Sequence, residues 1–350
     1  MHDNDIKTRP WPACPACGLA GSPLYRGLTD SVFNVPGVWD MSKCDNPDCG
    51  TLWLDPMPED ADLPKLYAGY YTHQPATLSP ASDDPLRALL GRVRAAYLHA
   101  HYGYDEPLSS SWADKLLGLV PWLYPAWKDS LQASVFHLHA QPGGCLLEVG
   151  CGSGAALQSM QQKGWRVTGL DFDEGAVNNA RSKGLDVRQG QLSAQEFADE
   201  SFDAVVMSHV IEHVPSPVEL LAECRRILKK GGVLVALTPN ARSSGHKHYG
   251  RNWRGLEPPR HLQIFTRQSL ANFAGRVGYA HVETFTTMNG FVYLDLASAE
   301  LAAGERHVMG GRVSLVRRIL SHVKALGLGW RRVVLASGNT GEELVLVCRK

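Results

Sequence analysis

The sequence predicts an α/β protein with a doubly wound, mostly parallel sheet of seven strands, preceded by a small metal-binding module and a helical connector. Three observations support this: two cysteine pairs near the amino terminus, a glycine-rich turn after residue 149, and apolar runs that alternate with helical segments beyond it. A chain of 350 residues can hold a core domain and an appendage. We expect a zinc-ribbon-like metal module at 1–56, a helical connector at 57–140 and the core domain at 141–350.

The composition excludes several classes of protein. Thirty-five Lys and Arg balance 35 Asp and Glu, so the chain lacks the bulk charge with which nucleic-acid coat proteins attract polyanions. A hydrophobic content of 44% disfavours disorder. No apolar run reaches about 18 residues, and residues 1–5 have no secretion signal character, so we expect a cytoplasmic protein.

The metal module is predicted from cysteine spacing. Four of the eight cysteines form two pairs, each closed by a glycine: Cys14, Cys17, Cys44 and Cys49. Zn²⁺ prefers four such ligands in a tetrahedron, and a proline-rich segment of this size buries too little apolar surface to hold its shape alone. We therefore expect a structural zinc ion. Iron in a rubredoxin-like site and four free thiols are the alternatives.

Within this connector, residues 73–85 are rich in Pro, Ser and Asp, so we expect a boundary there. From Leu86 to Leu138 the pattern is helical and aromatic, and prolines at 107, 121 and 125 interrupt it. Several short helices are therefore expected. They would pack on the core or cap a substrate pocket.

The core begins with a strand, a glycine turn and a helix. The apolar run Cys145–Val149 precedes Gly-Cys-Gly-Ser-Gly at 150–154, and a helix-compatible run starts at Ala155. A second strand leads to Asp171, 21 residues after Gly150. A carboxylate at that point can accept hydrogen bonds from both hydroxyls of an adenosine ribose.

The alternation continues to the end of the chain. Strands are expected near 186–189, at 202–207 and at 233–237, with a helix at 217–228 that stops at Lys-Lys-Gly-Gly. The last apolar runs, at 281–287 and 343–348, would close the sheet as an antiparallel pair. Such sheets bind ligands at the carboxyl ends of their strands.

Three strings carry a family resemblance: Glu-Val before the glycine turn, Ser-His-Val-Ile-Glu-His-Val at 208–214, and Leu-Lys-Lys-Gly-Gly followed by Thr-Pro-Asn at 238–240. With them the chain resembles the class I S-adenosylmethionine-dependent methyltransferases, which have a Rossmann-like fold, over roughly 140–290 and the last strand. Within that group it is similar to the ubiquinone-biosynthesis-like O-methyltransferases. The cysteine module resembles that of bacterial methyltransferases associated with sugar and cell-surface polysaccharide modification.

The resemblance implies S-adenosylmethionine as cofactor. Glu148 and the glycines would surround its methionine end, Asp171 would hold the ribose and Phe172 would lie against the adenine. At the adenine edge Gln189, Gln191 and Gln195 all stay open. The implied cofactor set is Glu148, Gly150, Cys151, Gly152, Gly154, Asp171, Phe172, Gln191, Leu192 and Ser208.

The first candidate catalytic stretch follows the strand at 202–207. His209 and His213 lie four residues apart with Glu212 between them. The string matches an inverted zinc-peptidase motif, but its place at a strand end of a doubly wound sheet disfavours a hydrolase. Two interpretations stay open: a divalent ion that binds substrate oxygens, or His213 facing the substrate while His209 packs near the cofactor backbone. Similar ubiquinone-type and small-RNA enzymes have an acid where this chain has His209.

The second stretch is the polar and aromatic loop at 240–262. His261 is the first choice for a base or substrate anchor, with Tyr249, Trp253 and Arg260 shaping the site. An ordinary surface loop is the alternative. The candidate catalytic residues are His261, His213, His209, Tyr249 and Arg260.

A basic helix is expected within an insertion at about 291–341. Between Arg306 and Gly341 there are seven Lys or Arg and no acid, and apolar residues recur at helical spacing at Val313, Val316, Leu320 and Val323. Such a helix covers the sheet or a partner subunit. Alternatively, residues 306–332 contact a membrane surface or a lipid-linked substrate.

We therefore expect methyl transfer to a hydroxyl of a small polar or sugar-containing acceptor. Nucleic acid is disfavoured as a partner because the net charge is zero and no Asn-Pro-Pro-Tyr follows the fourth strand. Two alternatives remain: an RNA methyltransferase that grips RNA with its zinc module, and an inactive nucleotide-binding scaffold.

Overall fold

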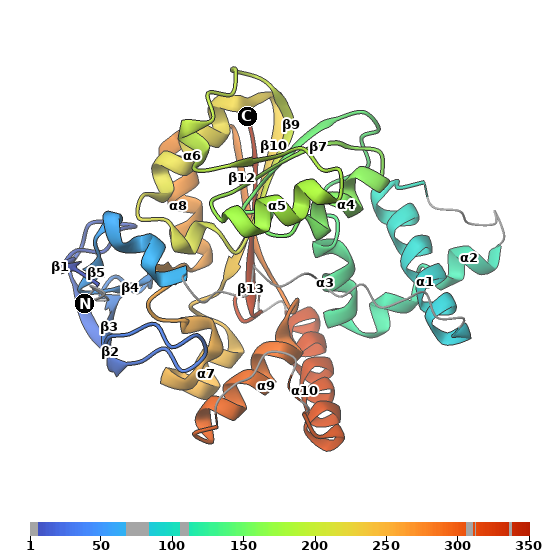
Figure 1. Ribbon diagram of the computed structural model, residues 1–350. Coiled ribbons are helices and arrows are strands. Elements are labelled where there is room, and N and C mark those ends of the chain that lie inside the picture. The colour runs from blue at the N-terminus through green and yellow to red at the C-terminus, as the bar shows by residue number, and fades with distance from the viewer. Residues whose placement is uncertain (1–5, 68–83, 106–111, 306–310, 312, 336–337) are drawn as a thin grey trace. The chain divides into compact units, whose positions relative to one another are not determined.

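The computed structural model describes residues 6–67, 84–105, 112–305, 311, 313–335 and 338–350 (Figure 1). The chain forms two compact units. Unit 1 comprises Met1–Tyr71, Ser208–Arg226 and Ala236–Lys350, and unit 2 comprises Thr72–Met207 and Ile227–Val235. Most of the connector expected at 73–85 lies outside the described residues, as do Arg306 and Arg312.

Seven strands form the central sheet, in the order β12-β13-β10-β9-β6-β7-β8. Strand β6 pairs in parallel with β7 and β9, β7 pairs in parallel with β8, and β12 pairs antiparallel with β13. This confirms the predicted sheet. The strands are β6 Cys145–Val149, β7 Arg166–Asp171, β8 Val187–Gln189, β9 Phe202–Ser208, β10 Leu228–Pro239, β12 His281–Thr287 and β13 Glu343–Arg349.

Helices follow the strands as the alternation predicts: α4 Ala155–Gln162, α5 Glu174–Ser182, α6 Pro217–Ile227 and α8 Arg267–Val277. The Asp173 side chain caps α5 by accepting a hydrogen bond from the Ala176 amide. The structure differs from the expectation at β10, which begins at Leu228 and so includes the Lys-Lys-Gly-Gly stretch. There Lys229 forms an ion pair with Asp203 at 2.8 Å and Gly232 lies close to the Asp203 carbonyl, so tertiary contacts extend the strand.

The aromatic stretch forms several helices, as predicted: α1 Pro85–Tyr102, α2 Trp112–Leu117, η3 Val120–Leu123 and α3 Pro125–Ala133. Tyr97, Tyr102 and Tyr104 are buried in unit 2, whereas Trp112 and Trp122 are exposed. The Tyr104 hydroxyl donates to the Leu138 carbonyl at 3.0 Å, and the Trp165 indole lies 3.4 Å from the same hydroxyl.

A second sheet lies in unit 1 and has the antiparallel order β11-β4-β3-β2. Its strands are β2 Gly21–Leu28, β3 Trp39–Cys44, β4 Leu52–Leu54 and β11 Gln263–Ile264, and a short pair joins β1 Thr8–Arg9 to β5 Met57–Pro58. The core on this sheet combines Trp39, Met41 and Leu54 with Trp253 and Leu262. The β4–β11 pair therefore crosses the boundary expected after residue 56.

The rest of unit 1 is largely helical. Short helices replace the expected loop at 240–262, and α9 and α10 contact each other in the carboxy-terminal part (Figure 1). None of the helices in the described ranges is long and apolar enough to cross a membrane. The remaining helices are η1 Asp60–Tyr67, η4 Leu192–Ala194, η5 Ile211–His213, α7 Ser244–Tyr249, η6 Gly250–Asn252, η7 Arg254–Leu256, α9 Phe291–Ala302 and α10 Leu315–Val334.

Candidate functional site

The glycine turn, residues 150–154, connects β6 to α4 in unit 2. Gly150, Gly152 and Gly154 have φ values of 73°, 51° and 77°, a region that side chains rarely adopt. A Cβ at Gly154 would lie 2.5 Å from the Leu185 side chain, whereas one at Gly152 would meet nothing within 4 Å. Gly154 therefore allows close packing of α4, and Gly152 leaves the backbone open to a ligand.

Two buried carboxyl groups flank the glycine turn. Glu148 is 4% exposed, and its Oε2 has no hydrogen-bond partner among the described residues. Burial, reinforced by the nearby charge of Asp171, raises the pKa of Glu148 to about 8. Asp171 accepts hydrogen bonds from the amides of Gly152 at 2.8 Å and Asp173 at 3.0 Å, and burial raises its pKa. A buried carboxyl group with an unpartnered oxygen fits a hydrogen-bonding, cationic ligand such as an adenosyl sulfonium, whose charge would favour the ionised form.

The residues expected at the adenine end lie after β7 and β8. Phe172 is 51% exposed and presents an open ring, while Leu192 is buried. The Gln195 amide donates to the carbonyls of Gln189 and Gln191 at 3.0 and 3.2 Å, so this side chain is already engaged within its own loop. Gln191 itself is exposed.

Two further residues of the expected cofactor set have limited roles in this geometry. The Cys151 sulfur lies close to Gly169 of β7, so this residue presents only its backbone to a ligand at the glycine turn. Ser208 is the last residue of β9 and is partly buried.

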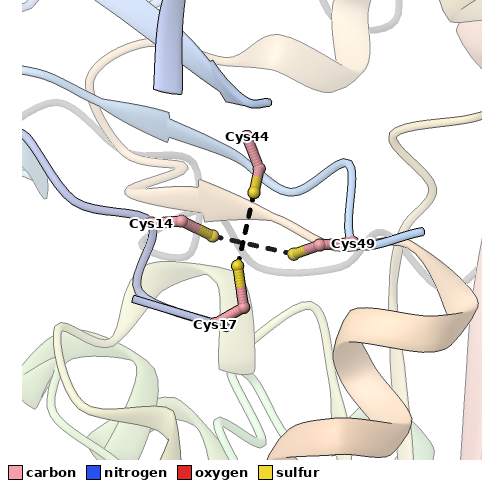
Figure 2. Close-up of side chains that lie close together, drawn as sticks. All are labelled: Cys14, Cys17, Cys44 and Cys49. Carbon is pink, nitrogen blue, oxygen red and sulfur yellow. Dashed lines mark hydrogen bonds between the residues drawn. The ribbon is translucent and has the colours of Figure 1, made fainter. Parts of the chain in front are cut away.

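The four cysteines of unit 1 converge on one point, as Figure 2 shows. Their sulfurs all lie within 4.8 Å of one another, with Cys14 to Cys49 at 3.6 Å and Cys17 to Cys44 at 3.4 Å. These separations are too long for disulfides, whose S–S bond is about 2.05 Å. They approach the edge of about 3.8 Å in a tetrahedron with 2.3 Å metal–sulfur bonds. The thiols therefore fit a four-coordinate ion.

Tight turns hold each cysteine pair. The Gly18 amide donates to the Cys14 carbonyl at 2.8 Å and the Gly50 amide donates to the Asn46 carbonyl at 3.0 Å. Both glycines have positive φ, which a tight turn at these positions requires. The Thr51 hydroxyl lies 3.3 Å from the Cys49 sulfur and adds a polar neighbour to the site.

Glu212, His213 and His261, here termed the histidine cluster, form a second group of converging ligand atoms in unit 1, again within 4.8 Å of one another. His213 donates from Nδ1 to the Arg260 carbonyl at 2.9 Å, and His261 donates from Nδ1 to the Gly255 carbonyl at 2.8 Å. A carbonyl can only accept, so both rings carry the proton on Nδ1. In its neutral form each ring therefore keeps an Nε2 lone pair for a proton or a metal ion.

The surroundings of the histidine cluster favour an ionised carboxyl group beside an uncharged imidazole. Glu212 accepts from the Thr238 hydroxyl at 2.9 Å and contacts His209 Nδ1 at 3.1 Å. Burial opposes its ionisation, but the surrounding histidines lower the pKa of Glu212 to about 2. Burial also lowers the pKa of His261 to about 4. The cluster thus combines a carboxylate with a neutral imidazole.

His209 has a different role from the other two histidines. Its backbone φ is 54°, and its ring lies between the carboxylates of Glu212 and Glu343, with Nε2 3.3 Å from Glu343. Burial opposes its protonation, but hydrogen bonds to Glu212 and Glu343 raise the pKa of His209 to about 10. It is therefore a cation that balances Glu212 and offers no lone pair.

Arg260 is fully buried and acts through its neighbours. Its guanidinium contacts Asp30 at 2.8 Å and Glu257 at 2.9 Å, and Arg254 also pairs with Glu257. Because the Arg260 carbonyl accepts from His213, this ion network fixes one imidazole of the cluster. Tyr249 donates to Asp295 at 2.7 Å and does not join the group.

Sequence reasoning missed the residues that support the cluster. Glu257 stands three residues before Arg260 in the turn that follows η7, so only their closeness in sequence could have indicated the pair. Asp30 is 230 residues from Arg260 and no pattern links them.

Comparisons with known proteins agree with the geometry of the glycine turn. Residues 123–284 match the family model described as a methyltransferase domain. A protein of Mycolicibacterium smegmatis, named a probable S-adenosylmethionine-dependent methyltransferase, is 38% identical over 29% of this chain and 40% of its own. The ubiquinone biosynthesis O-methyltransferase of Hahella chejuensis is 38% identical over 29% of this chain and 45% of its own.

The chain spans less than half the length of these curated relatives. A solved S-adenosylmethionine-dependent methyltransferase from Archaeoglobus fulgidus overlaps 60% of this chain and 88% of its own, at 18% identity and a TM-score of 0.42. The sequence relationships and the glycine turn agree on one assignment. Residues 123–284 match a methyltransferase domain, and the chain is similar to S-adenosylmethionine-dependent methyltransferases.

Proposed function

We propose that this protein is an enzyme that methylates a hydroxyl of a small polar or sugar-containing acceptor. The observation that supports it most is the buried, unpartnered Oε2 of Glu148 beside the open backbone of Gly152. A relative with O-methyltransferase in its name supports a hydroxyl as the attacked group. A lipid-linked sugar would offer the same acceptor chemistry.

The cofactor residues have distinct tasks in this proposal. When bound, S-adenosylmethionine supplies a methyl group that its sulfonium has already activated. Glu148, Gly150 and Gly152 would hold the methionine end, with Cys151 and Gly154 shaping the turn. Asp171 would accept from the ribose hydroxyls and Phe172 would cover the adenine. Gln191 and Leu192 would line the adenine edge. Ser208 would line the cofactor site away from the adenine.

His261 is the proposed base. Its Nε2 lone pair would accept the acceptor's hydroxyl proton, while the bond from Nδ1 to Gly255 holds the tautomer. The carboxylates of Glu257 and Glu212, at 3.8 and 4.0 Å from Nε2, would stabilise the imidazolium that forms. His213 would orient the acceptor. We propose that His209 and Arg260 support the cluster through their contacts with Glu212 and His213. Tyr249 hydrogen-bonds to Asp295 instead.

A divalent cation in the histidine cluster is a second candidate, because three ligand atoms converge and both Nδ1 protons are fixed. It would bind the acceptor's oxygen. Metal analysis and turnover after chelation separate the two interpretations: turnover that persists in cation-free protein supports the base, and turnover that returns only with added Mg²⁺ or Mn²⁺ supports the ion.

We further propose that the four cysteines hold one structural Zn²⁺. In small zinc modules binding contributes about 10–16 kcal/mol, comparable to a whole domain's stability. Cys49→Ser should therefore lose the zinc and unfold unit 1 at much lower denaturant concentration. Cys145→Ser, outside the cluster, is the matched control. Metal analysis that finds iron, or zinc retained by Cys49→Ser, would contradict the assignment.

The decisive experiment measures binding and turnover separately. Calorimetry with S-adenosylmethionine and S-adenosylhomocysteine tests the cofactor site, and absence of binding to both sinks the proposal. Labelled methyl transfer to nucleotide-sugars, glycans, phenols and RNA then tests the acceptor. Binding without turnover on any acceptor favours the scaffold, and a salt-dependent RNA complex with RNA methylation favours the RNA enzyme.

Reduced thiols and a nucleotide-like cofactor favour the cytoplasm as the compartment of this protein.

A further inference from the structure

Helix α10 turns its large apolar side chains away from the protein. The side chains it buries are small and lie one turn apart: Ser321, Ala325 and Gly329. They form the side of the helix that packs within unit 1, where α10 lies beside α9 (Figure 1). The apolar side chains on the other side are between 40% and 73% exposed: Leu315, Val316, Ile319, Leu320, Val323, Leu326, Trp330, Val333 and Val334.

The exposed residues form one continuous face. At 100° per residue they occupy an arc of roughly 140° along the whole helix. Arg317, Lys324 and Arg331 follow one border of this arc, and Arg318 lies beyond the other border, toward the buried side of the helix. Helix α10 contains no Asp or Glu. Positive charge therefore follows one border of the apolar face of α10.

Partners on the protein take up only part of this charge. Lys324 pairs at 3.1 Å with Asp295, whose side chain is buried, whereas Arg317 pairs with Glu305 at 3.2 Å at an exposed position where such a pair contributes little. Arg318 and Arg331 point into solvent. Their long stems can lie beside an apolar surface while the guanidinium groups reach a polar layer.

We propose that α10 docks on an anionic membrane surface, with its apolar face in the boundary between headgroups and acyl chains. A bilayer offers an apolar layer for the exposed apolar face and, directly above it, a layer of negative headgroups for the basic side chains. Trp330 lies on the apolar face, and indole rings favour this depth. A second copy of the chain is a poorer occupant, because two-fold pairing of α10 would place cationic side chains against each other.

The test is vesicle flotation of the full chain with matched substitutions. Leu320 and Leu119 are both 56% exposed, and Leu119 lies in unit 2, outside α10. Leu320→Glu should weaken binding to phosphatidylglycerol–phosphatidylcholine vesicles at least about tenfold, because it removes one apolar anchor and adds negative charge. Leu119→Glu should bind like the unaltered protein. Circular dichroism checks that both variants fold.

A second variant tests the basic side chains beside the apolar face. Arg318→Glu combined with Arg331→Glu should also weaken binding, and high salt should weaken binding of the unaltered protein. The proposal fails if the unaltered protein does not float with anionic vesicles, or if it binds pure phosphatidylcholine equally well. It also fails if Leu119→Glu loses as much binding as Leu320→Glu. Sedimentation that shows a dimer dissociated by Leu320→Glu would assign the face to a second copy instead.

Discussion

The glycine turn and the histidine cluster are built in opposite ways. In the glycine turn, neighbouring residues present backbone groups, and the side chains that bond them are Asp171, 19 residues from Gly152, and Lys183, 30 residues from Ser153. In the histidine cluster, side chains from separate segments converge, and each ring is held by a carbonyl of the stretch at 240–262. Arg260 then links that stretch to Asp30.

This difference affects what a substitution can do. A local backbone site tolerates changes elsewhere and responds mainly to changes at its own glycines. A convergent side-chain site depends on every contact that orients its rings. Substitutions at each site can therefore separate effects on cofactor binding from effects on turnover.

The largest effect is expected at the histidine cluster. His261→Ala or His213→Ala should lower turnover by about 10²–10⁴-fold while S-adenosylmethionine affinity stays unchanged, because a positioned base contributes that much and neither histidine belongs to the proposed cofactor set. Single-turnover kinetics with calorimetry measures both. His248→Ala, an exposed histidine of the same stretch, is the control. Full turnover in both cluster variants would remove these residues from the site.

A smaller effect is expected from Glu148. Its pKa in the folded protein is raised from 4.5 to about 8, so the folded state binds a proton that the unfolded chain releases. The free energy of unfolding is therefore greatest below pH 4.5. It decreases by on the order of 3 kcal/mol as pH rises toward 8. Glu148→Gln should flatten this decrease in cofactor-free protein and stabilise it at pH 8, while weakening cofactor binding. Thermal unfolding across this pH range provides the measurement; an unchanged slope would show that Glu148 is not the titrating group.

The smallest effect is expected at Gly152. Gly152→Ala places a methyl group where no protein atom lies within 4 Å, so it should lower cofactor affinity at least about tenfold by filling the cofactor's space. Gly184→Ala is the matched control, because Gly184 also has positive φ and open surroundings. Both should cost about 1–2 kcal/mol of stability through backbone strain. Equal cofactor affinity in the two variants would place the cofactor elsewhere.

The parts that sequence predicted are those encoded locally. The apolar runs of β6, β7 and β9, the glycine turn and the four converging cysteines all follow from short-range spacing. The β4–β11 pair could not be predicted, because a two-residue strand has no periodicity of its own. The contact between Asp30 and Arg260 was equally hidden. The spacing in α10 predicted a helix, but only the packing of Ser321 and Ala325 shows which side faces outward.

The β4–β11 pair also bears on synthesis of the chain. Leu52 and Trp53 pair with residues 263–264, so the amino-terminal sheet stays one strand short until about 210 more residues have been translated. At ribosomal speeds of 5–20 residues per second this interval lasts roughly 10–40 s. During it, the hydrogen-bonding edge of β4 is open to a neighbouring nascent chain. Although the amino-terminal module precedes the core in the chain, its sheet is completed only after residues 263–264 have been translated.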